Sequence, residues 1–113
     1  MTPGKLIGTL MQSRDIMHIA HLQTTSYAEH KALNGYYDGI LDLTDKFSEV
    51  YFGRKGRVEI IVPEAKIESA MSHLKKMQAV LDAEREYYDS ELQNIIDEML
   101  ALVNKTLYLL TLV

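Results

Sequence analysis

Two histidines and two carboxylates in the first half of the chain have the residue types of a metal site. His18 and His30 are followed by Asp45 and Glu49, and the two acids are separated by about one helical turn. Imidazole nitrogen and carboxylate oxygen together are the ligands of iron, zinc and manganese sites in proteins. These four residues therefore predict a transition-metal site, provided that the fold brings them together.

The composition predicts one small helical domain. A chain of 113 residues with 47% hydrophobic residues can bury a single core, so residues 1–113 are expected to form one domain. Because the chain has no cysteine, it has neither a disulfide framework nor a thiolate metal site. Its net charge of -4, without a basic tail or stripe, argues against nucleic acid as a partner.

Neither end of the chain predicts a membrane partner or secretion. The first residues lack the apolar run and the cleavage site of a secretion signal. The apolar run from Met99 to Val113 is interrupted by Asn104 and Lys105, and it is too short to span a bilayer. We therefore expect a cytoplasmic protein.

Hydrophobic periodicity predicts helices along most of the chain. The motif formed by Ser26 and Glu29 is typical of a capping box, which starts a helix at Tyr27. A β-branched run between Gly53 and Pro63 predicts a loop with an extended stretch. The four expected helices run from Lys5 to Leu22, from Tyr27 to just before Gly53, from Pro63-Glu64 to Arg85 through Ile67, and from a cap at Asp89 or Ser90 to Leu112.

The fold class that follows is an all-α four-helix bundle. Two short turns join the first helix to the second and the third to the fourth, whereas a longer crossover connection joins the second helix to the third. Gly35 and Gly39 lie inside the second helix, where they lower helix propensity, so we interpret them as a close crossing of helices.

This arrangement decides which of the candidate ligands can meet. His18 and His30 are equidistant from the turn at Thr24, so they are expected to face each other, and His21 takes the place of His18 if the turn is tighter. Asp45 and Glu49 project from one side of the second helix. However, His30 and Asp45 are separated by about 22 Å of helix, so no single ion can bind both within one chain.

A second copy of the chain solves this problem. In a two-fold dimer, each copy brings its carboxylates to the histidines of the other, which gives two equivalent metal sites. On a helical wheel, the residues of this flank lie beside the core stripe, where a neighbouring subunit can dock: His30, Asn34, Leu41, Asp45 and Glu49.

The order His18, His30, Asp45, Glu49 resembles the ferroxidase centre that the Dps miniferritins build between subunits. The stretch HIAHLQTTSYAEHKALNGYYDGILDLTDKFSEVYFG is also similar to small ferritin-like proteins of bacteriophages, and DSELQNIIDEMLALVNKTLYLLT resembles them more weakly. The resemblance implies a ferritin-like bundle in the host cytoplasm that assembles as a dimer or a cage. It also implies iron as the metal, with these four residues catalysing Fe(II) oxidation by oxygen or peroxide. Asn34 stands where the family has an aspartate, and Asp38 is a candidate peripheral ligand in its place.

Other readings of the same residues remain open. The histidines can be ordinary hydrogen-bonded side chains of a metal-free helical oligomer that acts as a structural or interaction protein. Zinc or manganese can also be held for structure alone. The tyrosines are expected to pack rather than to carry electrons, and the basic segment from Gly53 to Arg57 is expected to be a solvated turn. No Ser-His-Asp constellation can be argued from the sequence.

Overall fold

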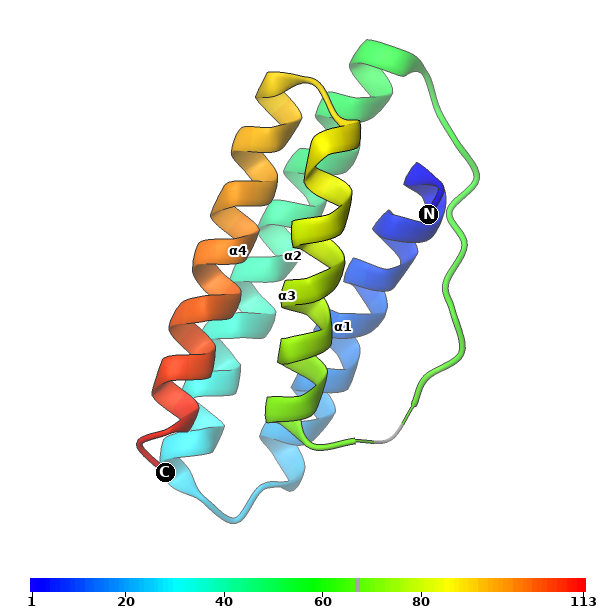
Figure 1. Cartoon of the computed structure of the whole chain (residues 1–113). Helices are drawn as coiled ribbons and strands as arrows, with labels where there is room; N and C mark the ends of the chain where they lie inside the picture. The colour runs from blue at the N-terminus through cyan, green and yellow to red at the C-terminus, as the bar shows by residue number, and fades with distance from the viewer. Residues whose placement is uncertain (67) are drawn as a thin grey trace.

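A computed structural model describes residues 1–66 and 68–113, so Ile67, a position expected in the third helix, lies outside the described residues. The described residues form four α-helices and a short 3-10 turn, with no strand among them (Figure 1). The elements are α1 Pro3–Gln23, α2 Tyr27–Lys55, α3 Ala70–Glu84, η1 Arg85–Tyr87 and α4 Ser90–Leu110. The prediction of an all-α chain with four helices is confirmed.

The helices lie side by side around one apolar core. α1 packs on α2, α2 packs on α4, and α4 packs on α3, whereas α3 touches α1 only lightly. Residues 56–66 lead from the end of α2 back along α1 toward the start of α3 (Figure 1). The largest fully buried side chains come from all four helices, and they include Leu6, Leu10, Leu33, Tyr36, Phe47, Leu74, Leu81 and Ile96.

Local capping explains where α1 and α2 begin. α1 starts at Pro3, slightly earlier than expected, because the hydroxyl of Thr2 accepts a hydrogen bond from the Lys5 N–H at 3.2 Å. α2 starts at Tyr27 as predicted, since the Ser26 hydroxyl accepts from the Glu29 N–H at 3.2 Å. The other half of the expected capping box is absent, because the Ser26 N–H donates to the Thr24 hydroxyl at 3.1 Å instead.

The predicted start of the third helix is wrong. α3 begins at Ala70, where the Ser69 hydroxyl accepts from the Ser72 N–H at 3.1 Å. Pro63 precedes the helix, and its carbonyl accepts a hydrogen bond from the Gln12 side chain on α1. α2 also runs past Gly53 and ends at Lys55. The next residue, Gly56, caps the helix with a φ of 91°, a conformation that glycine adopts readily.

We use the name strap for residues 57–63, which lie without regular structure along α1. The backbone of the strap packs directly against two glycines of α1. A Cβ on Gly4 would lie 1.9 Å from the carbonyl oxygen of Glu59, and a Cβ on Gly8 would lie 1.8 Å from the carbonyl oxygen of Ile61. The Ile61 N–H also donates to the Gly4 carbonyl at 3.1 Å. The strap therefore occupies a groove that exists only because α1 has glycine at both positions.

The two glycines inside α2 differ from each other. A Cβ on Gly39 would lie 2.8 Å from Cδ2 of Leu102 on α4, so the predicted close helix crossing is confirmed there. Gly35 has no atom within 4 Å of that position, so the same prediction is wrong for Gly35.

Candidate functional site

The turn between α1 and α2 brings two histidines into direct contact. The rings of His21 and His30 stack with their centroids 3.6 Å apart and their planes 18° apart. Nδ1 of His21 lies 2.6 Å from the carbonyl oxygen of His30, and Nδ1 of His30 lies 2.7 Å from that of His21. A carbonyl oxygen can only accept, so in both rings Nδ1 carries the hydrogen and Nε2 is left as the free nitrogen.

His18 lies beside this pair but does not stack on His30. Its ring stacks on Tyr37 of α2 at 4.2 Å, and its centroid is 6.0 Å from that of His21 with the planes tilted by 52°. The residue opposite His30 is thus His21, which is the tighter of the two registers considered from the sequence.

Ring geometry decides which of these nitrogens can share an ion. A metal lies in the plane of each imidazole that binds it, so two nearly parallel stacked rings such as those of His21 and His30 cannot bind the same ion in this conformation. The rings of His18 and His21 are tilted by 52° with their centroids 6.0 Å apart, so the parallel stacking that excludes a shared ion for His21 and His30 does not apply to this pair. In addition, a histidine that binds a metal through one ring nitrogen usually donates a hydrogen bond from the other, often to a backbone carbonyl, as Nδ1 of His21 does here.

The predicted carboxylate ligands lie elsewhere on α2. Asp38, Asp45 and Glu49 are all exposed, and Asp38 accepts a hydrogen bond from the Asn34 side chain at 3.2 Å. Asp45 lines a shallow pocket of about 300 Å³ between α1 and α2. Within one chain, the described residues contain no group of three or more histidine, cysteine, aspartate or glutamate side chains that could hold a metal ion. The histidines and the carboxylates of one copy are therefore not brought together.

These residues share one surface, which we call the outer α1–α2 face. It comprises Met11, Arg14, Asp15 and His18 of α1 together with Asn34, Tyr37, Asp38, Leu41 and Asp45 of α2. Its two helices are joined across the surface by the Arg14 guanidinium, whose carbon lies 5.5 Å from the Tyr37 ring centroid. Met11 and Leu41, which are 37% and 42% exposed, form an apolar centre between His18 on one side and Asp45 on the other.

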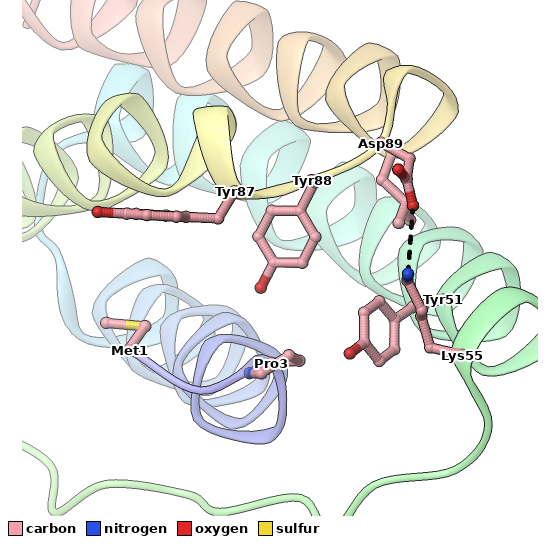
Figure 2. Close-up of a pocket in the computed structure, with 8 residues that line it drawn as sticks. Met1, Pro3, Tyr51, Lys55, Tyr87, Tyr88 and Asp89 are labelled. Carbon is pink, nitrogen blue, oxygen red and sulfur yellow. Dashed lines mark ion pairs between the residues drawn. The ribbon is translucent and has the colours of Figure 1, made fainter.

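The opposite end of the bundle holds a pocket of about 300 Å³ between the start of α1, the end of α2 and the start of α4. Figure 2 shows the hydroxyls of Tyr51 and Tyr88 directed toward the space beside Pro3. Burial, followed by the nearby Glu84 carboxylate, raises the pKa of Tyr88 to about 12, so this phenol stays neutral at physiological pH. The ring of Tyr88 packs edge-on against Phe47 at 5.2 Å.

The tyrosines of this pocket therefore divide into two kinds. Tyr51 and Tyr88 pack against the core, which confirms the packing role predicted for them. Tyr87 is 73% exposed, so it does not pack in the core of a single chain.

The structure contains a polar chain that the sequence did not indicate. Ser13 Oγ lies 2.7 Å from His73 Nε2, and Nδ1 of His73 lies 3.5 Å from a Glu68 oxygen. This order of groups resembles a Ser-His-Glu triad, but Ser13 is fully buried, so a substrate has no access to its hydroxyl. Because Ser13 and His73 are sixty residues apart, no local spacing could have revealed the pair.

No helix in the part of the chain that the structure describes combines the length and the apolar content needed to cross a bilayer.

Comparisons with known proteins give one family and one relative. Residues 21–110 match the model of a family described only as a family of unknown function, DUF5856. The chain is 33% identical over 110 residues to an uncharacterized 14.6 kDa protein in the mobD-ri intergenic region of Enterobacteria phage T4, with 94% of this chain and 85% of that protein covered. No solved structure matches the chain.

These findings correct the resemblance drawn from the sequence. The chain matches DUF5856 and the phage T4 protein, neither of which is described as ferritin-like, so the resemblance to Dps miniferritins and to ferritin-like phage proteins was wrong. The physical reason is that a few histidines and acids at helical spacings are easily matched by an amphipathic hairpin, and here His21 and His30 have a contact of their own within that hairpin.

Proposed function

The chain belongs to DUF5856, and we propose that it binds a first-row transition-metal ion at an interface between two copies of itself. The observation that carries the proposal is the pair His18 and His21, whose tilted rings are 6.0 Å apart. The bond from His21 Nδ1 to a carbonyl leaves Nε2 of this ring as a ready metal ligand. Two nitrogens alone make an incomplete site, so further ligands must come from outside this end of the chain.

The outer α1–α2 face supports a second copy as the source of these ligands. On this face His18, which stacks on Tyr37, lies on one side of Met11 and Leu41, and Asp45 lies on the other. A two-fold axis through that centre would place Asp45 and Glu49 of each copy against the histidines of the other. The same pairing would bury the two exposed apolar side chains, Met11 and Leu41.

The donor set favours iron, zinc or manganese over calcium or magnesium, because imidazole suits transition metals. With iron, the mixed nitrogen and oxygen ligands would accept both oxidation states, and Fe(II) oxidation by oxygen or peroxide is the reaction that such a site would support. The relative in phage T4 supports the cytoplasm of an infected bacterium as the place where the protein works.

Metal titration by calorimetry tests the proposal, with Zn(II) in air and Fe(II) under anaerobic conditions. We expect His18→Ala and Asp45→Asn each to weaken binding at least about tenfold, because each removes one ligand from the shared site. Asp82→Asn is the matched control, since Asp82 is an exposed carboxylate on α3 away from this face. The proposal fails if the wild type binds neither ion, or if His18→Ala binds as tightly as the wild type.

A metal-free helical oligomer is the second candidate, and the His21–His30 contact favours it. Both rings already have a structural partner, so these histidines need no ion to explain their positions. On this account the protein dimerises through the outer α1–α2 face without binding iron, zinc or manganese. A zinc or manganese site of purely structural use would instead show binding without Fe(II) oxidation.

A further inference from the structure

A buried polar chain joins three helices and the connection that precedes α3. Tyr36 Oη of α2 and His73 Nε2 of α3 each lie 2.7 Å from Ser13 Oγ of α1. Ser13 and Tyr36 are fully buried, and His73 is only 6% exposed. On the other side of the ring, Glu68 lies 3.5 Å from Nδ1 and pairs with Lys76 at 2.6 Å. Because α3 touches α1 only lightly elsewhere, this polar chain is a main link between the two helices.

When His73 is neutral, only one assignment of donors and acceptors satisfies the hydrogen bonds of this polar chain. Nδ1–H faces the Glu68 carboxylate, so Nε2 must accept from the Ser13 hydroxyl, and Ser13 Oγ then accepts from the Tyr36 hydroxyl. Two hydrogens thus fill two bonds, and each buried group in the chain is satisfied.

Protonation of His73 breaks this balance. The added proton gives His73 Nε2, Ser13 Oγ and Tyr36 Oη three hydrogens between them, although only two hydrogen bonds join these three atoms. Among the residues that the structure describes, neither Ser13 Oγ nor Tyr36 Oη has another hydrogen-bond partner. One buried hydrogen would therefore be left without an acceptor, which is costly in a site shielded from water.

We propose that this polar chain is an acid-sensitive latch, which releases the start of α3 and the preceding residues Ala65, Lys66 and Glu68 from α1 when His73 takes up a proton. Release lets water reach the unpaired hydrogen and the charged ring. α2 keeps its packing on α1 and α4 in the released state, because these two interfaces are the most extensive in the described structure, whereas α3 touches α1 only lightly. The change is thus confined to one corner of the bundle.

The charged groups that act on His73 are Glu68 on the connection and Lys76 on α3, while Ser13 and Tyr36 face it as neutral groups from α1 and α2. Burial lowers the pKa of His73 below its ordinary value of 6.5, and Glu68 opposes this only in part. The released state therefore binds the proton more tightly than the closed state. The latch is at full strength above about pH 6.5 and weakens as the pH falls below that value.

Hydrogen exchange followed by mass spectrometry tests the latch on the full chain at pH 7.5 and pH 5.5, after correction for the intrinsic effect of pH. One linked proton weakens a closed state by up to about tenfold per pH unit. We expect peptides covering 68–76 to lose protection by a factor of about 3 to 10 at the lower pH. Peptides from the middle of α2 and α4 should keep theirs, and equal loss of protection in all peptides would overturn the proposal.

Matched variants assign the effect to His73. His73→Gln cannot take up a proton, so the pH dependence of peptides 68–76 should disappear, whereas His18→Gln should retain it. Retention of the pH dependence in His73→Gln would overturn the proposal. If His73→Gln does not fold, nitrogen NMR of the wild type decides: we expect the Nδ1–H tautomer of His73 at neutral pH with a pKa below 6.5, and the Nε2–H tautomer or a higher pKa would contradict the latch.

Discussion

His21 and His30 each donate a hydrogen bond from Nδ1 to the backbone carbonyl of the other, at 2.6 and 2.7 Å, while their rings stack. The carbonyl of His21 belongs to the last turn of α1, which ends at Gln23, and such carbonyls have no partner within the helix. The ring of His30 therefore caps the end of α1 from the first turns of α2. This reciprocal pair fixes the register of the hairpin on which the rest of the candidate site depends.

Removing one ring should loosen the hairpin. We expect His30→Ala to lower the free energy of unfolding by about 1–2 kcal/mol, because the His21 carbonyl loses its donor and the ring contact is lost. Lys31→Ala is the neighbouring control, since Lys31 is exposed and on the same turn of α2. Urea denaturation at pH 7.5 measures both variants, and equal stabilities would show that the reciprocal pair contributes nothing.

The glycine groove of α1 gives a second prediction. Gly8→Ala should destabilise the protein by about 1–3 kcal/mol, because the added Cβ would collide with the carbonyl of Ile61 unless the strap moves. Gly35→Ala should instead stabilise it by up to about 1 kcal/mol, since that helical position faces open space. Thermal unfolding of the two variants should shift in opposite directions. Stabilisation by both substitutions would mean that the strap does not rest on α1.

The buried hydroxyl of Tyr36 gives a third prediction. Tyr36→Phe should cost about 1–2 kcal/mol at neutral pH, because the donor to Ser13 is lost in a site that water does not reach. Tyr108→Phe removes a hydroxyl from a side chain that is 63% exposed, and it should leave the free energy of unfolding unchanged. Guanidinium titration of both variants compares them, and an unchanged stability of Tyr36→Phe would contradict the polar chain.

The fold was predictable from the sequence wherever local signals decide it. The Ser26 cap and the apolar periodicity place α2 correctly at its start, and four helices are present as expected. The predicted start of α3 at Pro63 was wrong, because proline fits both the first turn of a helix and an extended segment. Gln12 and the glycine groove hold that segment against α1, and these are contacts between distant parts of the chain.

The candidate site was predictable only in part. The sequence indicated that the histidines meet at the hairpin turn, but whether His18 or His21 lies opposite His30 depends on how tightly the chain turns. The partnership of Ser13 and His73 has no local signal at all, because it depends on how α3 docks on α1. Whether a second copy completes the metal site stays a prediction.

Mixing two defective variants tests the shared metal site most directly. One variant carries His18→Ala and His21→Ala, the other carries Asp45→Asn and Glu49→Gln, and native mass spectrometry counts the bound Zn(II) ions. Neither variant should bind zinc alone, whereas the mixed dimer should bind one ion, because it rebuilds one complete site and leaves the other empty. A mixed dimer without zinc, or a protein that stays monomeric, would contradict the proposal that two copies share the metal site.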